Sequence, residues 1–180
     1  MQLSATKKLV FCAICVALCV VLPMAFHALG SGTVFLPMHV PVLLCGLVCT
    51  WPYGVVCGLL GPLLSSVLTG MPAMGYLPCM MVELGAYGLL CGLFMKFVRT
   101  GKIYVDLYIS LVGGLVIGRV IAGLFRALIF SPGSYSLAAW ATGYFVTCLP
   151  GLVIQLVLIP SIVFALMKAR LVPMRYPAKH

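Results

Sequence analysis

Acidic side chains are nearly absent from this sequence. Its 180 residues include two Asp or Glu against eleven Lys or Arg, and charged residues make up 7% of the chain. A soluble domain carries about 25% charged residues, so this chain lacks the polar surface that water requires. Two carboxylates also leave no paired-acid site for catalysis and little material for a proton relay. Lipid must be the solvent, and the length fits a single membrane domain over residues 1–180.

Signatures of nucleotide hydrolysis and of common hydrolases are missing as well. No GxxxxGK[ST] loop occurs, because the single Gly101-Lys102 pair is followed by Ile103. Neither HExxH nor GxSxG is present. The basic residues lie at the ends of apolar runs rather than in a stripe with aromatics, which excludes a nucleic-acid surface. We therefore expect no catalytic site, no cofactor and no nucleic-acid partner.

The nine cysteines predict neither a disulfide framework nor a metal site. Most lie inside apolar runs, where a free cysteine behaves as a small hydrophobic residue. Disulfide frameworks belong to small secreted domains. Cys12, Cys15 and Cys19 share one helical face, but no His, Asp or Glu lies near them in the sequence to complete a metal site. Packing is the interpretation that we adopt for these thiols.

Apolar residues are abundant, at 64% of the chain, and they fall into six segments. A membrane span needs about 20 residues, so the second segment is short. The first segment resembles a signal peptide but lacks a convincing small-x-small cleavage site, and we interpret it as a retained helix. The fold class expected is an all-α integral membrane protein with six transmembrane helices, at about 9–26, 38–50, 53–69, 78–97, 105–128 and 143–167.

The placement of basic residues predicts the topology. Lys and Arg accumulate on the cytoplasmic side of membrane proteins. Here they flank the start of the first segment and the ends of the fourth and sixth, whereas the loops 28–37, 70–77 and 129–142 contain none. With six crossings every basic flank lies inside, which predicts that both termini are cytoplasmic. GxxxG pairs at 54/58, 88/92 and 114/118 indicate close helix packing.

Among the charged residues within the apolar segments, three are good candidates for function: Glu83, Arg119 and Arg126. A charge in a membrane costs from about 2.5 to over 10 kcal/mol, so each is a candidate for function. At 1.5 Å per residue, Glu83 lies about 7–8 Å and Arg119 about 13 Å below the outer surface. All three lie in the outer half, which predicts a polar cavity that opens outward. Alternatively, Glu83 and Arg119 form an ion pair that locks two helices, and Arg126 snorkels to the interface.

Three uncharged or titratable residues join these as candidates for substrate binding. His39 begins the second segment beside the predicted cavity, although an interfacial histidine is often merely solvated. Tyr87 lies one helical turn below Glu83 on the same face. Gln155 lies deep in the sixth segment and needs a hydrogen-bond partner there. Asp106, by contrast, is interpreted as marking a helix start near the inner boundary.

Several stretches resemble one family of membrane proteins: Phe35 to Gly46 (FLPMHVPVLLCG), Gly58 to Pro72 (GLLGPLLSSVLTGMP), Val82 to Gly92 (VELGAYGLLCG) and Gly118 to Gly123 (GRVIAG). Together with Ala13 and Ala17, which match an AxxxA signature, they are similar to the S components of energy-coupling factor (ECF) transporters. The resemblance covers nearly the whole chain. Among S components, the sequence most resembles a branch linked to pantothenate.

The resemblance implies a mechanism and a set of partners. Such proteins capture a vitamin from outside a bacterial cell, in the plasma membrane, under the loop that joins the first two helices. They then dock on a transmembrane coupling protein driven by two ATPases, topple, and release the vitamin inside. Ala13 and Ala17 would form the docking face, because small residues let helices approach closely. Arg119, Arg126 and His39 would suit a vitamin that bears a carboxylate.

Two other classes of function remain open at this stage. A small membrane enzyme would need acids or a nucleophile–base pair at one interface, where only Asp106 is present. A scaffold subunit without a ligand would explain the small-residue pairs but not the costly charges in the outer half.

Overall fold

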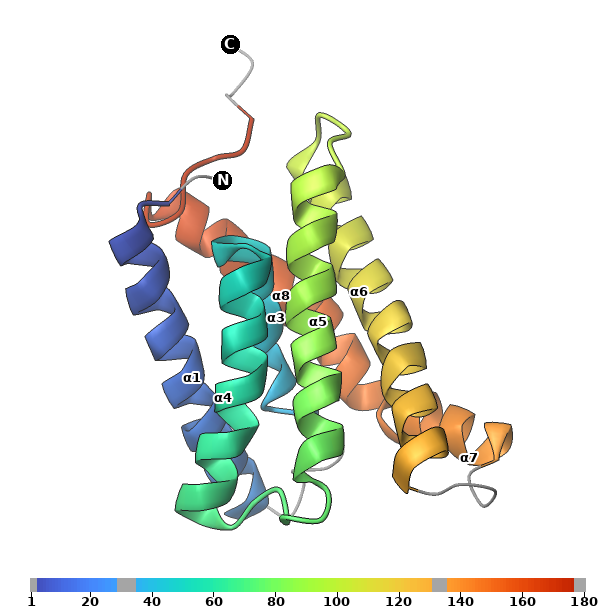
Figure 1. Cartoon of the computed structure of the whole chain (residues 1–180). Coiled ribbons are helices and arrows are strands. Elements are labelled where there is room, and N and C mark those ends of the chain that lie inside the picture. Colours follow the sequence, from blue (N-terminus) through green and yellow to red (C-terminus); the bar gives the residue numbers. More distant parts are fainter. Residues whose placement is uncertain (1–2, 29–34, 131–135, 177–180) are drawn as a thin grey trace.

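The computed structural model describes residues 3–28, 35–130 and 136–176, and every regular element in those ranges is a helix, which confirms the all-α class. The predicted loop 28–37 lies largely outside them. The described elements are α1 (Ala5–Ala28), α3 (His39–Cys49), α4 (Trp51–Thr69), α5 (Leu77–Phe97), α6 (Ile103–Phe125), η1 (Arg126–Phe130), α7 (Leu137–Ala141), η2 (Thr142–Thr147) and α8 (Leu149–Lys168), of which η1 and η2 are π-helical (Figure 1).

Five helices in the described ranges, α1, α4, α5, α6 and α8, are long and apolar enough to cross a membrane. The second predicted segment corresponds to α3, which has 11 residues, all of them buried. It packs against α1, α4 and α5, so it forms the centre of the bundle. A helix of this length is shorter than a full span of about 20 residues. The structure thus shows an all-helical membrane bundle, and the six-crossing topology stays a prediction.

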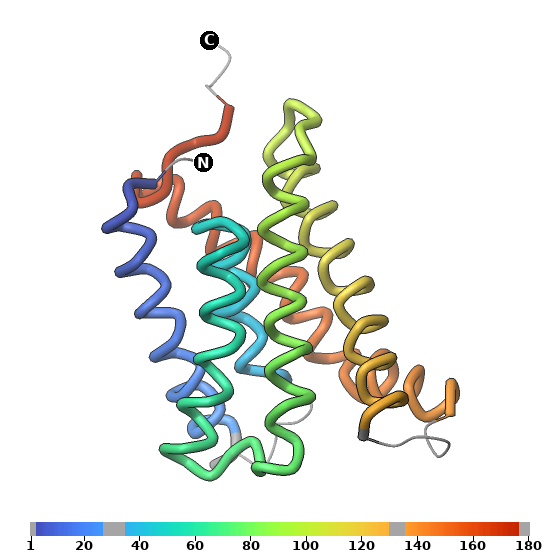
Figure 2. The backbone as a smooth tube through the Cα atoms, in the orientation of Figure 1, coloured from blue at the N-terminus to red at the C-terminus, as the bar shows by residue number. Residues whose placement is uncertain are grey.

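Most basic segments gather at one end of the bundle, which we call the basic end. The start of α1, the turn between α5 and α6 and the end of α8 lie there (Figure 1). The tube in Figure 2 shows the turn between α4 and α5 and the end of α6 at the opposite end. This arrangement agrees with the charge pattern that predicted cytoplasmic termini.

Glycines bring α4 and α5 into close contact. A Cβ atom on Gly58 would lie 2.5 Å from the carbonyl oxygen of Leu84, and one on Gly88 would overlap the backbone of Gly54. These distances leave no room for any side chain at either position. The predicted GxxxG packing is therefore confirmed at this helix pair, which holds the cavity-forming half of α5 in place.

The cysteines of α1 face the bundle, as predicted from their shared helical face. Cys12, Cys15 and Cys19 are at most 5% exposed. The thiol of Cys19 donates to the carbonyl of Met38 over 3.7 Å, which fixes α1 beside the start of α3. Ala13 and Ala17 lie on the exposed side of the same helix. The face that the AxxxA signature singles out is thus free of contacts with the described bundle.

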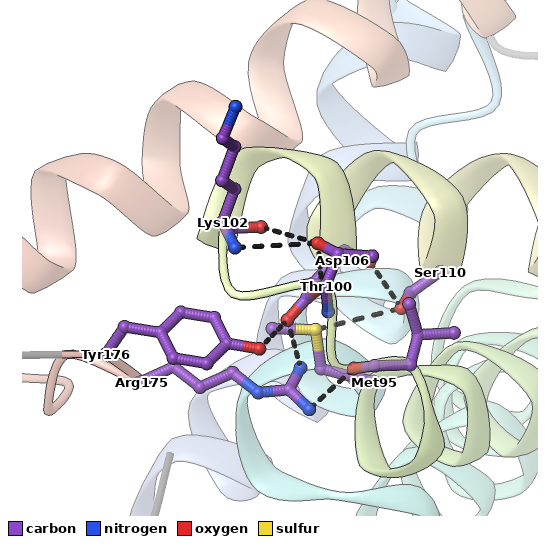
Figure 3. A network of polar contacts seen from close by, with 8 residues as sticks. Met95, Thr100, Lys102, Asp106, Ser110, Arg175 and Tyr176 are labelled. Carbon is purple, nitrogen blue, oxygen red and sulfur yellow. Dashed lines mark hydrogen bonds and ion pairs between the residues drawn. The ribbon is translucent and has the colours of Figure 1, made fainter.

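A network of polar contacts fastens the C-terminal tail at the basic end (Figure 3). Asp106, in the first turn of α6 as predicted, is fully buried. Its carboxylate accepts hydrogen bonds from the Tyr176 hydroxyl at 2.6 Å and from the backbone and side chain of Thr100 at 2.8 and 2.7 Å. Arg175 Nη1 lies 3.2 Å from the same carboxylate, and its Nη2 donates to Val98 at 2.7 Å. Asp106, one of the two acidic residues of the chain, therefore has a structural role.

Candidate functional site

A cavity of about 880 Å³ opens at the end of the bundle opposite the basic end. Its walls come from the last turns of α1, the start of α3, the turn Gly70–Tyr76, the first half of α5, the end of α6 and the η2 segment. Small-molecule sites in proteins usually measure about 300–1,000 Å³. The cavity is therefore large enough to enclose a metabolite.

Glu83 is a buried carboxylate with three protein donors. The hydroxyl of Tyr87 donates to Oε1 at 2.9 Å, and His39 Nε2 lies 3.3 Å from the same oxygen. The hydroxyl of Tyr144 donates to Oε2 at 3.3 Å. These partners come from α5, α3 and η2, so Glu83 joins three elements. A carboxylate offers about four acceptor sites, and the cavity side of Glu83 keeps room for one more donor.

His39 lines the cavity next to Glu83. Its side chain is buried, and its ring packs against that of Tyr87 with 5.4 Å between centroids. With Nε2 directed at the Glu83 carboxylate, Nδ1 is left without a hydrogen-bond partner among the described residues. A neutral imidazole that donates through Nε2 has an acceptor at Nδ1. His39 thus lines the cavity and contacts Glu83 through Nε2, while Nδ1 is buried.

Arg119 is a buried cation without a carboxylate partner. It is 1% exposed, and within the described ranges no acid lies within 4.0 Å of its guanidinium. Its Nε also lacks a partner there, and its Cζ lies 5.6 Å from the centroid of the Phe145 ring. The alternative of a Glu83–Arg119 ion pair is not what the structure shows, because Glu83 pairs with His39 instead.

Arg126 lines the same cavity, at the first residue of η1. Its Cζ lies 5.4 Å from the centroid of the Tyr76 ring, which belongs to the turn before α5. Burial raises the pKa of Tyr76 to about 12, so the phenol stays neutral at physiological pH. The guanidinium is therefore held over a neutral aromatic ring at the cavity wall, a cation–π arrangement.

The structure brings four of the predicted residues to the cavity wall: His39, Glu83, Arg119 and Arg126. Tyr87 lies behind Glu83 and reaches the site only through its hydrogen bond. Gln155 is fully buried in α8 but is not among the lining residues, and neither of its amide atoms has a partner in the described part of the chain.

Sequence reasoning missed two parts of the site. Tyr144 donates to Glu83 from a π-helical segment, and Tyr76 packs on Arg126 from a turn. A tyrosine near the end of an apolar segment usually belongs to the aromatic belt, so neither residue carried a distinguishing signal. The loop 70–77 was predicted, but the sequence did not indicate that its residues line the cavity.

These features define a class of protein. A helical membrane bundle with a cavity of this size at one end, lined by buried charged residues, is typical of a membrane-embedded binding protein for a small molecule. A family model described as ECF transporter, substrate-specific component matches residues 7–172. The chain belongs to this family. No curated protein and no solved structure matches the chain significantly.

Membership fixes the general role. The chain is the substrate-binding subunit of an ECF importer and a multi-pass membrane protein. Its family implies a small-molecule substrate and a module of membrane coupling protein and ATPases. Subunits of this kind transport rather than catalyse, in keeping with the missing nucleotide-binding loop.

Proposed function

We propose that this chain captures a small organic anion, with pantothenate as the candidate, from the outside of a bacterial cell. The cavity end faces out and the basic end faces the cytoplasm. The loaded subunit then docks through Ala13 and Ala17 on a coupling protein that two ATPases drive. His39, Glu83, Tyr87, Arg119, Arg126 and Gln155 form or support the binding site in this proposal.

The unpaired guanidinium of Arg119 carries the proposal. An ionised group in a low-dielectric site costs several kcal/mol unless a counter-charge accompanies it, by the order of magnitude for buried ions. Arg119 is 1% exposed and lines the cavity, but the described residues offer it no carboxylate. A bound carboxylate would supply the missing charge and match the planar fork of guanidinium donors.

The remaining polar groups favour a ligand with hydrogen-bond donors elsewhere on its frame. Glu83 Oε2 accepts a hydrogen bond from Tyr144, and its carboxylate keeps acceptor capacity toward the cavity. A hydroxyl or an amide N–H group of the ligand would use this acceptor capacity. Pantothenate combines a carboxylate with hydroxyls and an amide, which is why it is the candidate.

A scaffold role accounts for less of the site. Helix packing needs neither a cavity of about 880 Å³ nor a buried Arg119 that has no acid within 4.0 Å in the part of the chain that the structure describes. Both features cost folding free energy, because voids and uncompensated charges are destabilising. Binding of an anion would give both the cavity and the buried Arg119 a function.

The direct test compares pantothenate with pantothenol, which replaces the carboxylate by an alcohol and keeps the rest of the molecule. Calorimetric titration of the detergent-purified protein should give a dissociation constant for pantothenate at least about 30-fold below that for pantothenol, the low end for losing a buried charged pair. Equal affinities would refute the role of Arg119. Tight binding of another anion, but not of pantothenate, would correct only the candidate.

A further inference from the structure

The turn that follows α4 forms one wall of the cavity. Gly70, Met71, Pro72, Ala73 and Tyr76 all line it. Gly70 ends α4 in the left-handed conformation, at φ +73°, and its N–H bonds back to the carbonyl of Ser66. From there to Tyr76 the backbone has few hydrogen bonds of its own, so its position depends on what holds it from below.

Two adjacent buried serines of α4 hold this turn. The hydroxyl of Ser65 donates to the carbonyl of Met71 at 2.7 Å, and the hydroxyl of Ser66 donates to the carbonyl of Pro72 at 2.7 Å. Ser66 Oγ also lies 3.6 Å from the sulfur of Met74. Ser65 is fully buried and Ser66 is 5% exposed. Serine inside a helix usually bonds to its own preceding turn, so two hydroxyls directed at a loop are unusual.

Thr69 contacts both its own helix and the turn. Its hydroxyl donates to the carbonyl of Ser65 at 2.7 Å, the ordinary bond to the preceding turn, and accepts a hydrogen bond from the backbone N–H of Met71 at 3.3 Å. Ser65 and Ser66 instead donate their hydroxyl hydrogen bonds to backbone carbonyls of the cavity wall. The two carbonyls belong to the consecutive residues Met71 and Pro72, so the two hydrogen bonds together fix the position and orientation of this part of the turn.

We propose that Ser65 and Ser66 are positioning residues of the binding site: they clamp the turn Gly70–Tyr76 over the cavity and so set how readily molecules enter and leave it. The proposal rests on the cavity being the binding site. Neither serine lines the cavity, so neither contacts a ligand directly. The clamp acts on access, through the equilibrium between the closed turn and a locally opened one.

Cys148 provides a probe that needs no ligand. It lines the cavity and is only partly buried, whereas Cys91 in α5 is fully buried within the bundle. A membrane-impermeant maleimide should alkylate Cys148 through the cavity mouth, and alkylation at each site can be followed by peptide mass spectrometry. Cys91 then reports global unfolding in the same sample.

Removal of one clamp should raise the rate of Cys148 alkylation. Ser65→Ala and Ser66→Ala each delete one hydrogen bond, so about a fivefold faster rate is expected for each, with the double variant faster still. Ser161→Ala is the matched control, because its hydroxyl bonds to Val157 within α8 at 2.7 Å, on the exposed side of the helix. A rate equal to that of the Ser161→Ala protein would overturn the proposal.

A second variant covers the possibility that a serine variant unfolds and exposes Cys91. A Cβ on Gly70 would have no atom within 4 Å, so Gly70→Ala leaves packing untouched but strains the positive φ at the start of the turn. It should also speed Cys148 alkylation while Cys91 stays unreactive, and an unchanged rate would contradict the clamp. Failure of pantothenate to bind leaves this result standing, so the two proposals fail separately.

Discussion

At the scale of single residues, Arg119 and Glu83 show how much of the site can be predicted from charges within apolar segments. Both are expensive in a membrane segment, which marks them as functional candidates in the sequence alone. Tyr87 was expected on the same helical face as Glu83, but the other two partners were not predictable from the sequence, because His39 and Tyr144 reach Glu83 from α3 and η2. Pairing depends on the height and rotation of helices, which residue spacing along one helix does not determine.

Substitution of Arg119 should separate binding from stability. Arg119→Met keeps the length of the side chain but removes the charge, so affinity for the anion should fall by about 30-fold or more, as for truncation of one partner of a buried charge pair. The ligand-free protein should melt at the same temperature or higher, because an uncompensated buried charge is destabilising. Parallel titration and thermal unfolding in detergent measure both quantities.

The conservative variant Arg119→Lys serves as the control for this prediction. It keeps a positive charge but loses the planar fork of donors, so its affinity should lie between those of the wild type and Arg119→Met. A melting temperature that falls sharply in Arg119→Met, with the affinity unchanged, would assign Arg119 to folding instead of binding.

At the scale of elements, the apolar segments of the sequence correspond to helices, with differences at their ends. The segment expected at 78–97 is α5, Leu77–Phe97. The segment expected at 143–167 is instead a π-helical stretch, Thr142–Thr147, followed by α8, Leu149–Lys168. Pro150 explains the new start, because proline is favoured in the first turn of a helix. Hydropathy alone does not distinguish one long helix from two joined ones.

The close contact of α4 with α5 makes a prediction about stability. Gly88→Ala would place a Cβ against the carbonyl oxygen of Gly54, and backbone atoms cannot move aside as a flexible side chain could. We expect a loss of about 1–3 kcal/mol in unfolding free energy, the usual effect of overpacking. Gly75→Ala is the control, because a Cβ there meets no atom within 4 Å. Equal thermal stability of the two variants would contradict close packing at this seam.

The tail network at the basic end was beyond prediction for a related reason. Asp106 was recognisable as a residue of a helix start, but Arg175 and Tyr176 lie about seventy residues away in the chain and meet it only in the folded bundle. Long-range polar contacts of this kind follow from tertiary structure. They tie the turn between α5 and α6 to the tail that follows α8 (Figure 3).

At the scale of the whole molecule, the proposed ligand site and the proposed docking face lie on different parts of the bundle. The cavity lies at one end, and α1 presents an exposed apolar side on which Ala13 and Ala17 lie. The helix is anchored to the bundle through its opposite, cysteine-bearing side. A ligand site and a docking site that share few residues allow variants to affect one function without the other.

A bulky residue on α1 should block transport and spare binding. Ala13→Trp fills the small-residue face on which the coupling protein is proposed to dock, while the cavity is unchanged. Uptake of radiolabelled pantothenate by cells that contain the complete importer should be lost, and the affinity of the purified subunit should stay at the wild-type value. Val116→Trp, at a residue of α6 that is 46% exposed, controls for bulk at a lipid-facing position. Undiminished uptake in Ala13→Trp would remove α1 from the docking face.

The central claim is that the cavity holds a small anion through Arg119. Mass spectrometry of the small molecules released from the detergent-purified wild-type protein, beside the Arg119→Met variant, tests it most directly. We predict one organic anion in the wild-type sample, at a near-stoichiometric amount, that is absent from the variant. A retained molecule without an anionic group, or equal retention of the same anion by both proteins, would contradict the account.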